Sequence, residues 1–140
     1  MNKHNRSIGQ VTQSQYAAIA EAIEAYYDGL YRGDTTQLAR SFHSQASYMT
    51  ASGGEYVHID MDTYFDRVRA RESPMSQGSD YGYVLESISI AGPEAALVRL
   101  RSSMLGKRFD DFLSLAKIHG EWRIVAKLFH HEPEPQATQE

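Results

Sequence analysis

The residues best suited to chemistry lie in the last third of the chain. Lys127 stands between Ala126 and Leu128 in an otherwise apolar segment, and a lysine that loses its hydration needs an anionic partner or ligand. Asp110 lies one residue out of register with it across a predicted hairpin. The two side chains are interpreted either as an acid and base couple inside a pocket or as a structural ion pair at a pocket mouth.

The hairpin is predicted by a tight turn at His119-Gly120, which pairs Ile118 with Glu121. Alternation along each strand then separates two faces. One face is expected to carry Leu113, Leu115, Trp122, Ile124, Ala126 and Leu128, and the other Asp110, Phe112, Ser114, Ala116, Arg123, Val125, Lys127 and Phe129. Both faces are too apolar to be left in water. We expect the helices to cover one face and a second copy of the chain to cover the other, which gives a homodimer.

Side chains from the first half of the chain complete the candidate pocket. His43, directly after a predicted helix, is either a pocket acid or base or a cap on the helix end. The tyrosine hydroxyls either reach a ligand or belong to core packing. Which of Asp110 and the neighbouring Asp111 faces the pocket stays open, because alternation puts them on opposite faces. The candidate catalytic residues are Asp110, His43 and Tyr26, and the candidate ligand-binding residues are Lys127, Tyr27, Tyr48, Phe112 and Phe129.

Composition and motifs exclude several function classes. The 140 residues carry a net charge of −4, no cysteine and no long basic cluster, which argues against thiolate chemistry and nucleic-acid binding. The adjacent His130 and His131 point to opposite sides of a strand and do not form a metal site. No cofactor motif is present, and no apolar run reaches transmembrane length. We expect a cytoplasmic protein that takes a small apolar or acidic molecule and uses no metal, cofactor, nucleic acid or membrane.

The predicted elements describe one domain over residues 12–131, with flexible tails at 1–11 and 132–140. Glycine, proline and short polar residues that favour turns separate short runs whose composition is typical of strands. Strands are expected at 46–51, 55–59, 81–90, 95–105, 108–118 and 121–131. Helices that precede such a run of strands pack on one face of an antiparallel sheet, so the fold class is α+β.

Three helices are predicted from the residues at their ends. A capping box at Thr12 starts a long amphipathic helix, and Gly33 ends it. Asp34 caps a short second helix over 35–41, and Asp60 caps the third. The apolar spacing of each helix indicates one buried face.

With its elements in this order, the chain resembles the nuclear transport factor 2-like superfamily, and within it the lumazine-binding group of SnoaL-like proteins. The resemblance rests on the segments AIEAYYDGLYRGDTTQLARSFHSQASY, ESISIAGPEAALVRLR and FDDFLSLAKIHGEWRIVAKLFH. It implies a cone-shaped, cystatin-like fold, with three N-terminal helices packed on a curved antiparallel sheet around a pocket, and usually a dimer. It implies no single activity, because this fold hosts isomerases, dehydratases, hydrolases and binding proteins.

Ketosteroid isomerases share this fold, and their functional residues can be compared with this chain one at a time. Tyr26 falls at the position of their oxyanion-donating tyrosine. Thr50 falls at the position of their general-base aspartate and cannot act as a base near neutral pH, and Ser114 falls near their second acid. One match among these positions predicts that their chemistry is absent here.

Three functions remain open from the sequence. The first is a small-molecule-binding pocket of unknown ligand, with or without cofactor-independent acid and base activity. The second is an isomerase or dehydratase of the SnoaL or ketosteroid isomerase type. The third is a non-catalytic dimerisation module. A pocket lined by Lys127, Asp110, His43 and tyrosines favours the first two, whereas a pocket filled by its own side chains favours the third.

Overall fold

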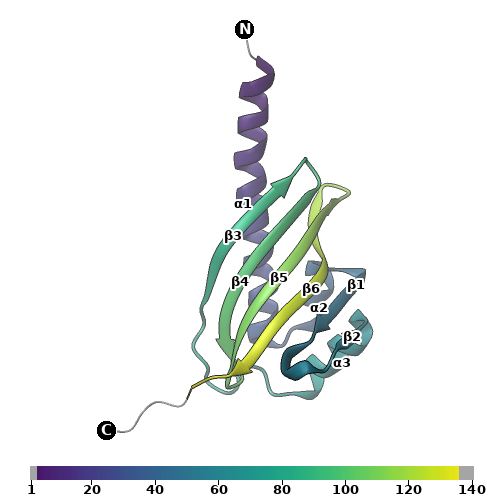
Figure 1. The fold of residues 1–140 in the computed structure, drawn as a ribbon, viewed down its shortest axis with the longest axis vertical. Coiled ribbons are helices and arrows are strands. Elements are labelled where there is room, and N and C mark those ends of the chain that lie inside the picture. The colour runs from purple at the N-terminus through teal and green to yellow at the C-terminus, as the bar shows by residue number, and fades with distance from the viewer. Residues whose placement is uncertain (1–2, 136–140) are drawn as a thin grey trace, which may run out of the picture.

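Three helices pack against a bent six-stranded sheet (Figure 1). The computed structural model describes residues 3–135, with side chains from residue 13 onward. The elements in chain order are α1 (Lys3–Arg32), α2 (Thr35–Ser41), β1 (Phe42–Thr50), the short 3₁₀ turn η1 (Ser52–Gly54), β2 (Val57–Ile59), α3 (Met61–Ala70), β3 (Tyr83–Ala91), β4 (Ala95–Met104), β5 (Lys107–Ile118) and β6 (Glu121–Pro133). This order confirms the predicted α+β class.

The sheet is mixed rather than wholly antiparallel. Its strand order is β2-β1-β6-β5-β4-β3, and β1 pairs in parallel with β6 while every other neighbouring pair is antiparallel. The expectation of an antiparallel sheet is therefore wrong at this one junction. Parallel strands need a long crossover, and here α3 and the three strands β3 to β5 supply it. The junction brings Tyr48 beside Lys127.

Helix α1 starts earlier in the chain than the capping box at Thr12 predicted. It begins at Lys3, so residues 3–11 are helical and Thr12 is an interior residue of the helix. A run without proline allows the helix to continue past a local capping signal. At the other end of the domain, β6 extends to Pro133. The expected tail residues 1–2 and 136–140 lie outside the described residues.

Local capping signals elsewhere are confirmed. The Asp34 carboxylate accepts a hydrogen bond from the backbone N–H of Gln37 at 3.1 Å, and Asp60 accepts one from Thr63 at 2.9 Å. Both satisfy backbone donors that a helix start leaves free. Gly33 ends α1 in a left-handed conformation with φ 67°. The two aspartate caps fix where α2 and α3 begin.

Two tight turns connect the last three strands. His119 and Gly120 have φ of 51° and 81°, and Ile118 pairs with Glu121 across them, which confirms the predicted turn. Leu105 and Gly106, with φ of 57° and 71°, join β4 to β5 in the same manner. Positive φ at both central residues matches the twist of a hairpin. A leucine in this conformation carries a backbone cost of about 1 kcal/mol.

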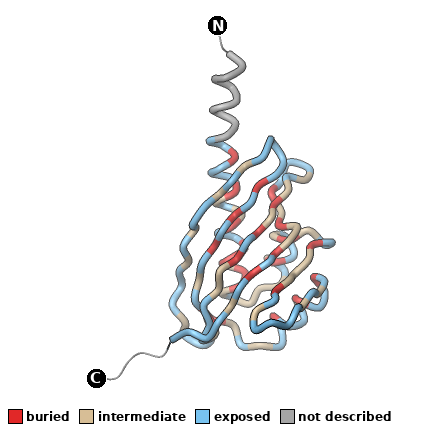
Figure 2. Tube along the Cα trace, in the orientation of Figure 1, coloured by how far each residue is buried: buried red, intermediate tan, exposed pale blue. Residues whose placement is uncertain are grey.

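The core lies between the helices and the facing side of the sheet. Buried residues follow alternate positions of the central strands (Figure 2). The largest fully buried side chains include Tyr26, Tyr27, Tyr64, Phe42, Ile19, Ile23, Leu38, Leu100, Leu113 and Ile124. Trp122 is 8% exposed and belongs to this cluster, as expected for a structural residue. Within the described residues, no helix is long and apolar enough to cross a membrane.

Candidate functional site

A small cavity opens between α1, α3 and the inner face of the sheet. Its volume is about 30 Å³, close to the space that one water molecule occupies in the liquid. The lining residues are Leu30, Tyr48, Tyr64, Arg71, Ser102, Met104, Leu105, Phe109, Asp111 and Lys127. Charged and aromatic side chains therefore line the cavity and nearly fill it.

A β-bulge decides which residues of β6 reach this cavity. Ser114 pairs with Ala126 while Leu115 pairs with Ile124, so Val125 is left without a partner on β5. One extra residue reverses the alternation of side chains along a strand. Lys127 therefore pairs with Leu113, and both side chains are buried. The simple two-residue alternation expected from the sequence fails at this point.

The reversal corrects several predicted positions. Leu128, expected in the core, is 47% exposed, and Phe112, expected in the pocket, is also 47% exposed on the outer face. Asp110 lies on that outer face as well, where it accepts hydrogen bonds from Arg99 at 3.0 and 2.8 Å. The Arg99 hydrogen bonds lower the pKa of Asp110. Asp110 is thus a surface ion-pair residue and not a partner of Lys127.

The Lys127 ammonium lies within a group of aromatic rings. Its Nζ is 4.9 Å from the ring centre of Phe129 and 5.4 Å from that of Tyr26. Tyr64 and Tyr48 lie at 5.4 and 5.5 Å. Aromatic faces attract a cation, and the attraction grows when water is excluded. Since Lys127 is only 5% exposed, these rings replace much of its hydration.

Asp111, the neighbour of Asp110, is the acid that shares the interior with Lys127. It is 3% exposed, and burial raises its pKa while the nearby Lys127 charge lowers it. The Tyr26 hydroxyl lies close enough to Asp111 to lower its pKa as well. Neither Asp111 Oδ1 nor the hydroxyl of the fully buried Tyr26 has a hydrogen-bond partner of standard geometry. A buried polar atom without a partner costs about 1 to 3 kcal/mol. Such atoms are commonly satisfied by an ordered water or by a ligand. The indole N–H of Trp122, which does not line the cavity, is unpartnered as well.

Arg71, Tyr48 and Tyr64 complete the polar lining of the cavity. Arg71 follows the last residue of α3 and is partly exposed. Burial raises the pKa of Tyr64, and the Arg71 guanidinium beside its hydroxyl lowers it. Burial likewise raises the pKa of Tyr48, and the nearby Lys127 charge lowers it. Both tyrosine hydroxyls are therefore neutral donors near neutral pH.

The other sequence candidates lie elsewhere. Tyr27 is buried, and its hydroxyl accepts a hydrogen bond from the Gly82 N–H at 3.1 Å in a separate cluster of tyrosines. His43 lies at the surface near His119, and its Nδ1 accepts from the Gln45 N–H at 3.0 Å. Neither lines the cavity. The expected convergence of His43 on Lys127 is therefore wrong.

Three residues of the cavity were missed by sequence reasoning. Asp111 was left as the alternative to Asp110, because the bulge that selects it carries no glycine or proline signal. Tyr64 lies on the buried face of α3, where helical apolar spacing predicts core packing and gives no sign of a cavity. Arg71 has no local signal, since its role depends on where α3 ends. Across the described residues, no group of three or more histidine, aspartate or glutamate side chains is arranged to hold a metal ion.

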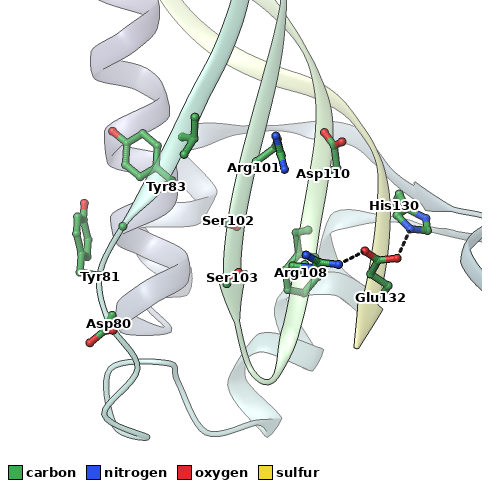
Figure 3. Close-up of a pocket in the computed structure, with 13 residues that line it drawn as sticks. Asp80, Tyr81, Tyr83, Arg101, Ser102, Ser103, Arg108, Asp110, His130 and Glu132 are labelled. Carbon is green, nitrogen blue, oxygen red and sulfur yellow. Dashed lines mark hydrogen bonds and ion pairs between the residues drawn. The ribbon is translucent and has the colours of Figure 1, made fainter. Parts of the chain in front are cut away.

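A larger hollow of about 580 Å³ lies over the ends of β3 to β6 (Figure 3). Apart from Asp80, its charged side chains are already paired, and Asp110 is held by Arg99. Arg108 donates to Glu132 at 2.8 Å, and Glu132 is 3.5 Å from His130. Arg101 pairs with Glu86 at 2.9 Å. An open trough whose charges are already paired offers less to a ligand than the interior cavity.

Comparison with known proteins agrees with this architecture. Residues 14–130 match the sequence model of the family described as "Putative lumazine-binding". The chain belongs to this family. The match covers both the helices and the sheet that enclose the cavity, so the family assignment extends over the whole site.

Similar proteins in this family and fold carry different descriptions. An aldolase named FrzH from Cladobotryum sp. is 28% identical over 125 residues, which cover 88% of this chain and 96% of that protein. An NTF2-like protein of unknown function from Shewanella baltica is 28% identical, with a TM-score of 0.76 over 86% of this chain and 96% of its own. Another from Silicibacter pomeroyi is 27% identical, with a TM-score of 0.72 over 86% and 98%. The nuclear transport factor 2-like fold is thus shown.

Proposed function

We propose that this protein binds a small carbonyl compound in the interior cavity and transfers a proton at the carbon beside the carbonyl. The observation that carries the proposal is the pair of unpartnered buried polar atoms, Tyr26 Oη and Asp111 Oδ1, beside the Lys127 ammonium. The nearly filled cavity favours a module that only dimerises, but such a module gains nothing from unpartnered polar atoms, whose burial destabilises the fold. Substrate binding and proton transfer both need polar atoms that are free to contact the substrate, as these two atoms are.

The roles of the three groups follow from their charges. Asp111 has a raised pKa, which makes its carboxylate a better base than an ordinary aspartate. It takes a proton from the substrate carbon, and the electron pair of that C–H bond moves onto the carbonyl oxygen to form an enolate. Lys127 stabilises the negative charge on that oxygen. The Tyr26 hydroxyl, beside Lys127 and without a partner in the structure, donates a hydrogen bond to the enolate oxygen when the substrate is bound.

This chemistry differs from that of a ketosteroid isomerase. Thr50, at the position of the isomerase base, donates a hydrogen bond to the Phe129 carbonyl at 2.7 Å. Ser114 lies on the outer face of β5, opposite the buried side. Only Tyr26 remains from that catalytic set. Enolate formation is also the first half of an aldol reaction, and the relative named an aldolase supports a carbonyl substrate.

Deuterium exchange tests the proposal without knowledge of the natural substrate. Acetone is small and enolisable, and NMR follows the uptake of deuterium into its methyl groups in D₂O. We expect the wild-type protein to accelerate the exchange, and Asp111→Asn and Lys127→Met each to reduce it by at least tenfold. Lys117→Met, which removes an exposed lysine of the same sheet, is the control. Equal exchange with wild type and both cavity variants contradicts the proposal.

We also propose that the protein functions as a homodimer through the outer face of the sheet. Each of the strands β3 to β6 exposes one large apolar side chain there: Val84 at 57%, Leu97 at 44%, Phe112 at 47% and Leu128 at 47%. A second copy that covers this face needs to bury about 1,000 Å² or more in total. This pattern supports the dimer and leaves the interior cavity, on the other side of the sheet, outside the interface.

A further inference from the structure

Arg71 is a second cation of the interior cavity, and nothing in the proposed proton transfer uses it. Both Arg71 and Lys127 line the cavity. Among residues 13–135, neither forms an ion pair with a carboxylate, although six arginines do. An arginine that faces a cavity without a carboxylate partner is available to bind an anion.

The charges around the cavity do not balance. Two cations face it, and Asp111 is the single acid among the lining residues. At most one negative charge therefore opposes two positive charges. The positive field of Arg71 reaches the buried hydroxyls as well, since it lowers the pKa of Tyr26, Tyr48 and Tyr64. An anionic ligand would neutralise this excess.

The two cations also lie at different depths. Lys127 is 5% exposed and held among aromatic rings, whereas Arg71 is partly exposed at the end of α3. A guanidinium presents two parallel donors that match a carboxylate, and an ammonium acts as a point charge. The solvent side of the cavity is therefore suited to a carboxylate and the deep side to a single oxygen.

We infer that the ligand is a small oxo acid whose carboxylate binds Arg71 while its carbonyl oxygen faces Lys127. This inference rests on the proposed function of the same cavity and names the class of compound that enters it. Because the cavity is about 30 Å³, the ligand displaces the Arg71 side chain from its present position as it binds. Arg71 then lies over the bound carboxylate and selects charged compounds over neutral ones.

Three probes of similar size test this assignment by NMR titration. Pyruvate carries both groups, pyruvamide replaces the carboxylate with a neutral amide, and propionate lacks the carbonyl. We expect pyruvate to bind the wild-type protein at least tenfold more tightly than pyruvamide, because a hydrogen-bonded charge pair is roughly twice as strong as a neutral one. We expect propionate to bind more weakly than pyruvate.

Variants of Arg71 identify the residue responsible. Arg71→Gln should bring the pyruvate to pyruvamide ratio close to one, and Arg71→Lys should restore part of it. Arg69→Gln is the matched control, since Arg69 is an exposed arginine of α3 paired with Asp66, and it should keep the wild-type ratio. Far-ultraviolet circular dichroism checks that each variant is folded.

The results separate this inference from the proposed function. An Arg71-dependent preference for pyruvate supports the inference even where acetone exchange is absent, which contradicts only the proton transfer. Equal affinities for pyruvate and pyruvamide, a preference that survives in Arg71→Gln, or no binding of any probe overturns the inference. If the affinities are equal, or if the preference survives in Arg71→Gln, acetone exchange still tests the proposed function independently.

Discussion

The interaction between Lys127 and Asp111 is the first feature to test, because both side chains are buried in one interior. They are 5% and 3% exposed, and no ion pair within 4.0 Å joins them among the described residues. Two unit charges roughly 5 Å apart, at an effective dielectric constant of about 20, interact by about 3 kcal/mol. Lys127→Met keeps the length of the side chain and removes the charge. Asp111→Asn does the same for the acid.

A double-mutant cycle measures this interaction by urea unfolding at pH 7. We expect Asp111→Asn to destabilise the protein more than Lys127→Met, because it leaves a buried ammonium without compensation, whereas a buried carboxyl can take up a proton. The double variant should be more stable than the sum of the single changes by about 2 to 3 kcal/mol. Asp110→Asn with Arg99→Met is the control cycle, and an exposed pair contributes less than about 1 kcal/mol.

The pH dependence of stability gives the same interaction an independent readout. The pKa of Asp111 is raised by burial in the folded state, so above the unfolded value of about 3.9 the folded protein holds the proton longer. The free energy of unfolding contributed by this group therefore falls as the pH rises from that value through the folded pKa. Lys127→Met removes a charge that lowers this pKa, so the fall should extend to higher pH. Asp111→Asn should abolish it.

Two results would refute the reasoning. A coupling energy no larger than that of the Asp110 control cycle means that Lys127 and Asp111 do not interact in the interior. A pH profile that is identical in wild type and Lys127→Met means that the lysine charge does not act on the Asp111 carboxyl. Either result removes the physical basis for their joint role in the cavity.

Three further changes test separate parts of the structure. Trp122→Ala should lower the free energy of unfolding by about 3 to 5 kcal/mol, because Trp122 is packed in the core, and an unchanged urea midpoint speaks against this. Leu105→Asn should leave stability within about 1 kcal/mol, because relief of the left-handed leucine offsets lost contacts, and a larger drop of the free energy of unfolding in urea contradicts this. Leu128→Asp should give a monomer by sedimentation if the outer face is the dimer interface, while Lys117→Asp should not.

Features that depend on neighbouring residues were predictable from the sequence. Asp34 and Asp60 lie directly beside the backbone donors that they cap, and the turn at His119-Gly120 depends on its own two residues. These signals placed α2, α3 and the last hairpin correctly. They are local, so no knowledge of the rest of the fold is needed to recognise them.

Features that depend on distant pairing were not predictable in the same way. The bulge at Val125 arises where β6 lies between β5 and β1, and it carries no sequence mark of its own. Its position decides that Asp111 rather than Asp110 shares the interior with Lys127. The start of α1 was missed for a different reason, since the capping signal at Thr12 is present in the sequence but unused in a helix that continues back to Lys3.

The most direct test of the account is the location of a bound probe. Methyl groups report the location by NMR. Leu30, Met104 and Leu105 line the interior cavity, and Val84 lines the larger hollow over the ends of β3 to β6. Titration with pyruvate should shift the methyl signals of the three cavity residues in a saturable manner and leave Val84 unchanged. Saturable shifts at Val84 with none at the cavity residues would contradict the claim that the interior beside Lys127 is the ligand site.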